Sequence, residues 1–173
     1  MPAGANAIAR ASQTIANELL EHSRDTHAGT LGFAPSCNLA IRREALEDLR
    51  FDERFPLAAG EDRAWSDRAR VLGRPPAWEP GGIVIHHQRL TLASFARQQA
   101  GYGRGAARYR SLPDGGGRRP VSPRFVAGLV AAGFAQGARV GALVGAAQAL
   151  TAAGLAAELT SGGARQHRRG GAG

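Results

Sequence analysis

The chain has 173 residues and a formal net charge of +8, and arginine supplies all of that excess because lysine is absent. Hydrophobic residues make up 43% of it but aromatic residues only 6%, so Ala, Val and Leu must supply most of the core packing. The single cysteine, Cys37, excludes an internal disulfide and fits a reducing compartment. We expect Cys37 to be a small buried residue in a strand.

Hydrophobic periodicity predicts three longer helices in the first two thirds of the chain, and a brief helix is expected at 43–49. Apolar residues recur at helical spacing in 5–22, 61–72 and 92–109. Two short strands are predicted between them. In 37–42 apolar and polar residues alternate, and 82–86 is rich in β-branched residues.

The composition changes after the third predicted helix. Residues 111–123 are rich in Pro, Gly and Arg and predict a flexible linker. Residues 124–160 consist mainly of Ala, Gly, Val and Leu and predict a helical segment. This segment is long enough for a pair of membrane-spanning helices. It could equally form a helical hairpin that lies on a membrane or packs on a partner protein. Residues 161–173 are expected to form a disordered basic tail.

The basic charge favours an anionic partner such as a phosphate-bearing ligand or an acidic membrane surface. Nucleic acid is not expected, because the arginines cluster in the predicted linker and tail without interleaved aromatic residues. The first residues lack the pattern of a signal peptide. We therefore expect a cytoplasmic location. If the C-terminal segment binds lipid, the chain is expected at the inner face of the plasma membrane.

Two adjacent carboxylates, Glu61 and Asp62, follow Gly60 where a loop meets the helix predicted for 61–72. A carboxylate fixed at such a junction can serve as a general base. The same residues also suit a helix start, where acids complement the helix dipole. On spacing alone both readings stay open.

Three blocks of sequence resemble one known family when they are taken in order. They are 35–43 (PSCNLAIRR), 51–55 (FDERF) and 60–62 (GED), followed by Asp67-Arg68 and by His86 after a β-branched run. They resemble the acceptor-side half of family 2 glycosyltransferases, which have the GT-A fold. The resemblance covers about residues 5–110. It implies an α/β fold class: a partial GT-A domain over 1–110, with a short mixed sheet, flanking helices, and Ala/Gly-rich helices after it.

The resemblance also implies an activity and roles for individual residues. It implies a hexosyltransferase that inverts the anomeric centre as it moves a sugar from a nucleotide-sugar donor to a carbohydrate or lipid-linked acceptor. Asp62 matches the general base. Glu61 and Asn38 match the acceptor site, and Arg97 and Gln98 match the helix that approaches the diphosphate.

The family's nucleotide-binding half, with its Asp-x-Asp metal motif, has no counterpart in the sequence. The resemblance implies a divalent metal, Mg²⁺ or Mn²⁺, in the complete enzyme, with His86 near it. Without Asp-x-Asp we expect this chain alone to hold no metal, and we expect it to be incomplete as an enzyme. The alternative function is a non-catalytic module, derived from a glycosyltransferase, that binds a membrane or a partner.

Overall fold

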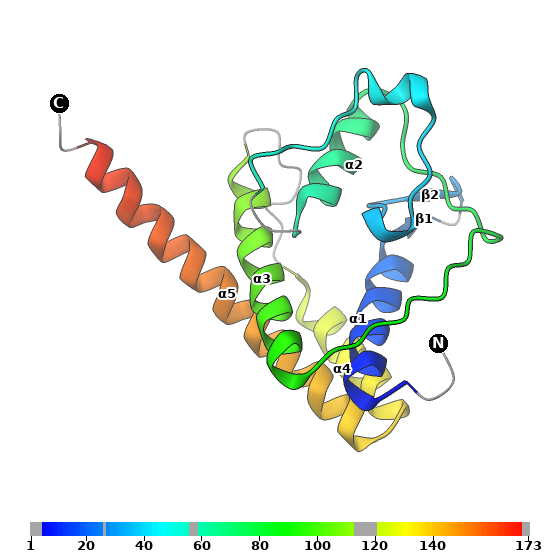
Figure 1. The fold of residues 1–173 in the computed structure, drawn as a ribbon, viewed down its shortest axis with the longest axis vertical. Coiled ribbons are helices and arrows are strands. Elements are labelled where there is room, and N and C mark those ends of the chain that lie inside the picture. The colour runs from blue at the N-terminus through cyan, green and yellow to red at the C-terminus, as the bar shows by residue number, and fades with distance from the viewer. Residues whose placement is uncertain (1–4, 26, 56–58, 113–120, 171–173) are drawn as a thin grey trace.

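The computed structural model describes residues 5–25, 27–55, 59–112 and 121–170, with side chains as far as residue 161. These residues form mostly helices and one small sheet (Figure 1). The elements in chain order are α1 (Ala7–Ser23), β1 (Arg24–Asp25), β2 (Thr30–Leu31), the 3-10 turns η1 (Ser36–Asn38) and η2 (Arg43–Leu46), α2 (Glu61–Val71), α3 (Leu92–Ser111), α4 (Pro123–Ala135) and α5 (Ala138–Gly170).

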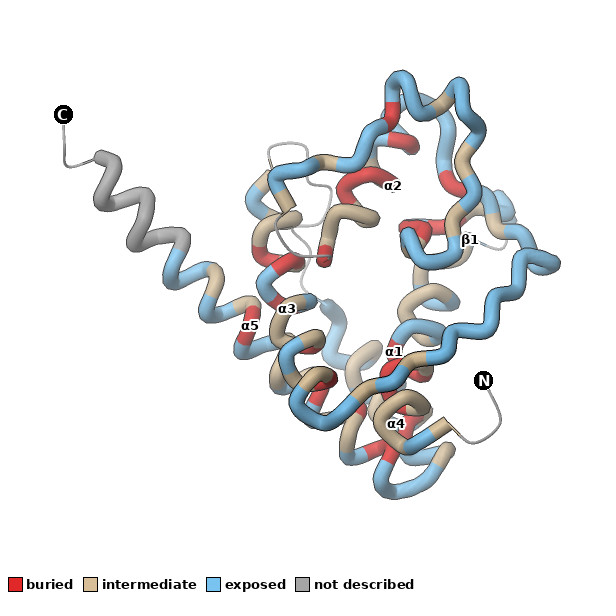
Figure 2. Tube along the Cα trace, viewed as in Figure 1, coloured by how far each residue is buried: buried red, intermediate tan, exposed pale blue. Residues whose placement is uncertain are grey.

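Four helices, α1, α3, α4 and α5, pack together into what we call the helical base. Its core is a cluster of buried side chains to which all four helices contribute: Ala11, Ile15, Phe95, Leu129, Val140, Val144 and Ala147. Figure 2 marks buried residues along these helices. The C-terminal end of α5, beyond its contacts with α3, extends away from the other helices (Figure 1).

Small residues allow the helices of the base to approach closely. A Cβ atom on Gly103 of α3 would overlap the carbonyl oxygen of Thr151 on α5, and one on Gly154 would overlap that of Ala100. The pair is also joined by an ion pair between Arg108 and Glu158, at 2.8 Å. The α3–α5 contact therefore brings the two backbones together, as small residues do at other tightly packed helix pairs.

The second region, which we call the upper lobe, contains β1, β2, η1, η2, α2 and the loops between them. Its core is small: Leu49, Trp65 and Ala69 are buried, and Leu39 and Ile41 pack against them. The Trp65 indole nitrogen donates a hydrogen bond to the Leu49 carbonyl at 3.0 Å. A tryptophan in the middle of the 61–72 pattern thus fixes α2 on the loop that precedes it.

The expectation of helices combined with a short sheet is confirmed, but the sheet is small and antiparallel. β1 pairs with β2, with Arg24 opposite Leu31 and Asp25 opposite Thr30. Thr30 forms a further antiparallel bridge to Ala77. The chain is therefore mostly helical with one antiparallel hairpin, and the mixed sheet expected for this region is not found among the described residues.

The strand predicted at 37–42 is wrong. Residues 36–38 form the 3-10 turn η1, and no neighbouring strand pairs with the residues that follow it within the described chain. Leu39 and Ile41 of the alternating pattern do pack against the core, but a strand also needs a partner for its backbone groups. Cys37 is exposed on this turn, which corrects the expectation that it is buried.

The structure describes the C-terminal segment in part. Residues 113–120 of the expected linker lie outside the described residues, and α4 and α5 pack into the core of the base. The helix α5 continues to Gly170, whereas a disordered tail was expected from residue 161. Adding a residue to an existing helix costs less than starting one. One stretch, Ala138–Ser161, is long and apolar enough to cross a membrane by length and composition.

Candidate functional site

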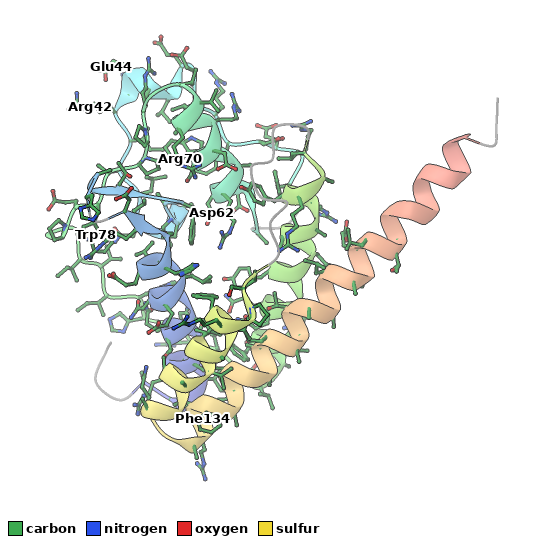
Figure 3. The ribbon with its side chains drawn as sticks, turned by 180° about the vertical axis from the view of Figure 1, so that it is seen from behind. Arg42, Glu44, Asp62, Arg70, Trp78 and Phe134 are labelled. Atoms are coloured by element: carbon green, nitrogen blue, oxygen red, sulfur yellow. The ribbon has the colours of Figure 1, made fainter. Side chains whose placement is uncertain are left out.

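The helix α2 begins at Glu61, so the predicted junction of loop and helix is confirmed. Its N-cap is Gly60, with a φ of 93° in the left-handed region that glycine tolerates best. Glu61 and Asp62 lie in the first turn, where the free backbone N–H groups of a helix favour carboxylates. Figure 3 labels Asp62 at this end of α2.

The loop that carries Gly60 is held directly against α3. A Cβ on Gly60 would lie 2.8 Å from the carbonyl oxygen of Gly105, and one on Gly105 would overlap the carbonyl of Ala59. Both positions therefore require glycine for reasons of space. This contact places the first turn of α2 beside the middle of α3.

A buried hydroxyl fixes Asp62 from the other side. The Ser66 side chain, fully buried, donates to the Asp62 carbonyl at 2.7 Å and accepts from the Ala34 backbone N–H at 3.0 Å. Arg63 adds a cation–π contact, its guanidinium carbon 4.2 Å from the centre of the Phe33 ring. The 33–34 loop, α2 and α3 together define the position of the Asp62 backbone.

Burial raises the pKa of Asp62 above its ordinary value. A hydrogen bond from the Arg63 backbone N–H to Asp62 Oδ1, at 2.8 Å, and the nearby Arg63 charge act in the opposite direction. A carboxylate with a raised pKa is a stronger proton acceptor when it is ionised. This is the tuning that a general base needs near neutral pH.

Glu61 shares this environment. Burial, and to a smaller extent the charge of Asp62, raise the pKa of Glu61. Its Oε2 atom is buried and accepts no hydrogen bond from the described residues. A ligand that donates a hydrogen bond would satisfy this oxygen, as a sugar hydroxyl does.

Tyr102 on α3 is a site residue that the sequence did not reveal. Phe95 on the same helix is 1% exposed, whereas Tyr102 is 42% exposed. Partial burial raises the pKa of Tyr102, and the charges of Asp62, Cys37 and Glu61 raise it to a smaller extent. The sequence pattern that could have identified Tyr102 is one face of α3 on which successive residues are three or four positions apart: Gln98, Tyr102, Gly105 and Tyr109.

The far end of this α3 face also contacts α2. The Tyr109 hydroxyl donates a hydrogen bond to Asp67, which in turn pairs with Arg70 at 2.8 Å. Partial burial and this hydrogen bond raise the pKa of Tyr109 to about 12. Asp67 belongs to the sequence block that resembles the glycosyltransferases, and its contacts here fix α2 on α3.

Asn38 lies on η1, next to Cys37. The charge of Cys37 is one of the smaller causes that raise the pKa of Tyr102. The side-chain nitrogen of Asn38 donates to the Gly82 carbonyl at 2.9 Å. This bond ties η1 to the segment before His86. The amide nitrogen of Asn38 is therefore occupied by the chain itself, and its acceptor-binding role stays a prediction.

His86 lies on an exposed segment without a paired strand, so the strand predicted to end there is not formed by the described residues. Its Nδ1 is 3.3 Å from the side-chain nitrogen of Gln88. Within the described ranges no three His, Cys, Asp or Glu side chains come together as metal ligands. The place of His86 near a metal in the complete enzyme stays a prediction.

Arg97 and Gln98 lie in the first two turns of α3. Arg97 is exposed, and Gln98 is half-buried one turn before Tyr102. The Oε1 atom of Gln98 is buried without a hydrogen-bond partner among the described residues. Their proposed contact with a diphosphate stays a prediction.

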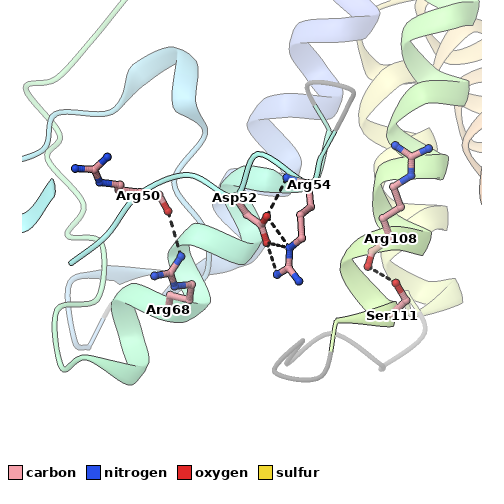
Figure 4. Close-up of polar contacts among 6 residues, drawn as sticks. All are labelled: Arg50, Asp52, Arg54, Arg68, Arg108 and Ser111. Carbon is pink, nitrogen blue, oxygen red and sulfur yellow. Dashed lines mark hydrogen bonds and ion pairs between the residues drawn. The ribbon is translucent and has the colours of Figure 1, made fainter. Parts of the chain in front are cut away.

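Within the FDERF block, Asp52 and Arg54 are joined by several hydrogen bonds. Asp52 accepts hydrogen bonds from the backbone and guanidinium of Arg54, the shortest at 2.6 Å (Figure 4). These bonds lower the pKa of Asp52 to about 2. Arg68 of α2 reaches the same stretch by donating to the Arg50 carbonyl at 3.2 Å. The block therefore shapes the loop that leads to Gly60.

Comparison of the chain with protein-family models, with curated proteins and with solved structures finds no match.

Proposed function

We propose that the chain is the acceptor-side part of an inverting glycosyltransferase of the family 2 type, with a partial GT-A fold. Asp62 is the general base that takes the proton of the acceptor hydroxyl as that oxygen attacks the anomeric carbon and the nucleoside diphosphate leaves. Glu61 and Tyr102 bind the acceptor beside it. Arg97 and Gln98 approach the diphosphate.

The observation that supports this proposal is that Asp62, whose pKa burial raises, stands next to a second carboxylate in the first turn of α2, at a junction packed against α3. Gly60, Gly105 and Ser66 hold that junction in place. A first-turn acid whose role is to complement the helix dipole would be expected in solvent, where its pKa falls. Partial burial of a carboxylate works against that role and favours proton transfer.

The first experiment measures acceptor binding by the wild-type chain. Saturation-transfer NMR with a panel of monosaccharides and oligosaccharides should give signals that weaken in Glu61→Gln and in Tyr102→Phe. The matched control is Glu47→Gln, on an exposed acid outside the site. Absence of saccharide contact in the wild type would count against an acceptor site here.

The second experiment measures transfer, after the chain is combined with a family 2 nucleotide-binding half. Asp62→Asn should lower turnover by about 10²–10⁴-fold, because the general base is lost. Wild-type turnover should rise with pH as Asp62 loses its proton. Unchanged turnover in Asp62→Asn would remove the assignment, and Asp48→Asn, on an exposed acid, is the control.

A second candidate function is a non-catalytic module that binds an acidic membrane. The stretch Ala138–Ser161 favours it, because it is apolar with only 28% of its apolar window buried, and α5 continues into an arginine-rich end. Val140, Val144 and Ala147 lie in the core of the base, so binding would use the opposite, alanine-rich face. Sedimentation with anionic and neutral vesicles tests this: recovery of the chain in the supernatant with both would contradict it.

A further inference from the structure

The segment from Gly82 to His87, which we call the edge segment, is exposed along its whole length (Figure 2). Three consecutive β-branched apolar side chains lie at its centre, Ile83, Val84 and Ile85, which are 81%, 55% and 67% exposed. Large apolar side chains in a row on a protein surface mark a place where another chain binds.

The backbone of the edge segment is also open. Its ends are fixed by bonds from Ile83 N–H to the Gly81 carbonyl and from Gln88 N–H to the His86 carbonyl. Between them, Val84 and Ile85 make no backbone hydrogen bond within the described part of the chain. Free donors and acceptors beside β-branched side chains form a template for an added strand.

Proteins usually protect such an edge with a charged side chain or a proline, and this segment has neither. Residues 81–88 read GGIVIHHQ, without Asp, Glu, Lys or Arg. A lipid surface does not fit the open backbone, because a membrane interior leaves peptide groups without hydrogen-bond partners. The occupant that fits is a polypeptide strand.

We infer that the edge segment pairs, antiparallel, with the same segment of a second copy of this chain. Its central sequence reads the same in both directions around Val84, so a two-fold axis at Val84 places Val84 opposite its counterpart and Ile83 opposite Ile85. Every pair at the centre is then β-branched against β-branched, which favours cross-strand packing. No like charges meet across the axis.

The dimer should be weak and sensitive to salt. A single two-stranded ribbon is marginal by itself, and each copy carries a net charge of +8. Salt screens the repulsion between the copies while leaving the apolar pairing in place. Raising the salt concentration should therefore increase the dimer fraction, whereas binding to an acidic partner would weaken. This inference does not depend on the proposed glycosyltransferase activity.

The first experiment is sedimentation velocity of the full chain over a range of concentrations at high salt. The wild type should show a concentration-dependent dimer, which Val84→Lys should abolish because two like charges then meet on the axis. Val71→Lys is the control, since Val71 is 84% exposed on α2, outside the segment. Val84 is exposed in the monomer too, so both variants should retain the wild-type circular dichroism.

The second experiment tests the register by disulfide trapping in a Cys37→Ser background, which removes the exposed native thiol. Residues directly opposite each other in an antiparallel pair have Cα atoms about 4.5–5.5 Å apart, within the range that a disulfide bridges. Val84→Cys should therefore cross-link two copies on oxidation. Ile83→Cys should not, because two such residues are diagonal across the axis, about 7–8 Å apart.

The outcomes separate the possible occupants. Dimer formation that Val84→Lys abolishes, together with cross-linking by Val84→Cys alone, supports the inference. A wild type that stays monomeric at every concentration and salt, with no cross-link from Val84→Cys, overturns it and leaves the edge to a different polypeptide. Equal cross-linking by the two cysteine variants, or dissociation in Val71→Lys as well, also overturns it.

Discussion

The helical base and the upper lobe are held together by different kinds of contact. In the base, buried apolar side chains from four helices meet, and glycines bring backbones together. The upper lobe has three buried side chains at its core and depends on side-chain bonds to backbone, such as those of Ser66, Trp65 and Arg68. The candidate site lies where the two regions meet, with its carboxylates on the lobe and Tyr102 on the base.

The difference indicates a division of roles. A well-packed base can hold α3 rigidly, while a loop-rich lobe can present polar groups that a tight core would exclude. The lobe should open locally at lower free energy than the base. The following predictions test that contrast.

The largest effect is expected where α3 meets α5. Gly103→Ala should destabilise the chain by about 4 kcal/mol or more, above the usual range for overpacking, because its Cβ meets a backbone carbonyl that cannot rotate away. Gly101→Ala, on the same helix with open space around it, should stabilise by about 0.5–1 kcal/mol. Urea denaturation measures both. Equal effects would show that the close α3–α5 contact is not present in solution.

A matched pair of leucines compares the two regions directly. Leu49 in the lobe and Leu129 in the base are both 2% exposed. Leu129→Ala should cost about 3 kcal/mol of global stability, and Leu49→Ala about 2 kcal/mol, since the smaller core can relax. Hydrogen exchange should show Leu49→Ala exposing the amides of α2 while those of α3 and α5 stay protected. Loss of protection throughout the chain in Leu49→Ala would mean that lobe and base unfold as one unit.

Asp62→Asn should increase stability at neutral pH, by less than either leucine change costs. Its pKa is raised by burial, so the native state loses stability as pH rises from the ordinary Asp value through the raised one, and that loss persists above it. The Asn side chain does not ionise, so it avoids this loss of stability. Its amide oxygen can still accept the hydrogen bond from the Arg63 backbone N–H. Thermal denaturation across pH checks this. A variant that is less stable than the wild type at neutral pH, or equally stabilised in strong acid, would contradict it.

The smallest effect is expected at Asp52. Its pKa is lowered to about 2, so its contribution is full above the ordinary Asp value and is lost as pH falls toward about 2. Because the partner Arg54 is 75% exposed, Asp52→Asn should cost less than about 1 kcal/mol at neutral pH. The difference from wild type should vanish in strong acid. A difference that stays constant with pH would assign the effect to packing.

Much of the fold follows from local patterns. The helices predicted at 5–22, 61–72 and 92–109 appear as Ala7–Ser23, Glu61–Val71 and Leu92–Ser111, because each pattern records which face is buried. The strand at 37–42 failed because a strand depends on a neighbour that its own residues do not specify. The Asn38 bond to Gly82 joins residues 44 positions apart, and no local pattern predicts it.

The candidate site was predicted in part for the same reason. Gly60, Glu61 and Asp62 form a local motif, and the structure has the helix start where the sequence placed it. Tyr102 was missed because its direction depends on how α3 is rotated. That rotation is set by the contacts of Gly103 with α5 and of Gly105 with the 59–60 loop, which lie far apart in sequence.

The single turn of α3 from Tyr102 to Gly105 limits which insertions and deletions the chain can accept. Gly103 lies against α5, Gly105 lies against the loop before Asp62, and Tyr102 begins the same turn with a hydroxyl whose pKa the charges of Asp62 and Glu61 help to raise. Inserting one residue into this turn would rotate everything after it by about 100° and break the later contacts together. The turn should therefore tolerate neither insertion nor deletion, although loops on either side accept both. Variants with one residue inserted or deleted within 102–105 should lose stability, whereas the same changes in the neighbouring loops should not.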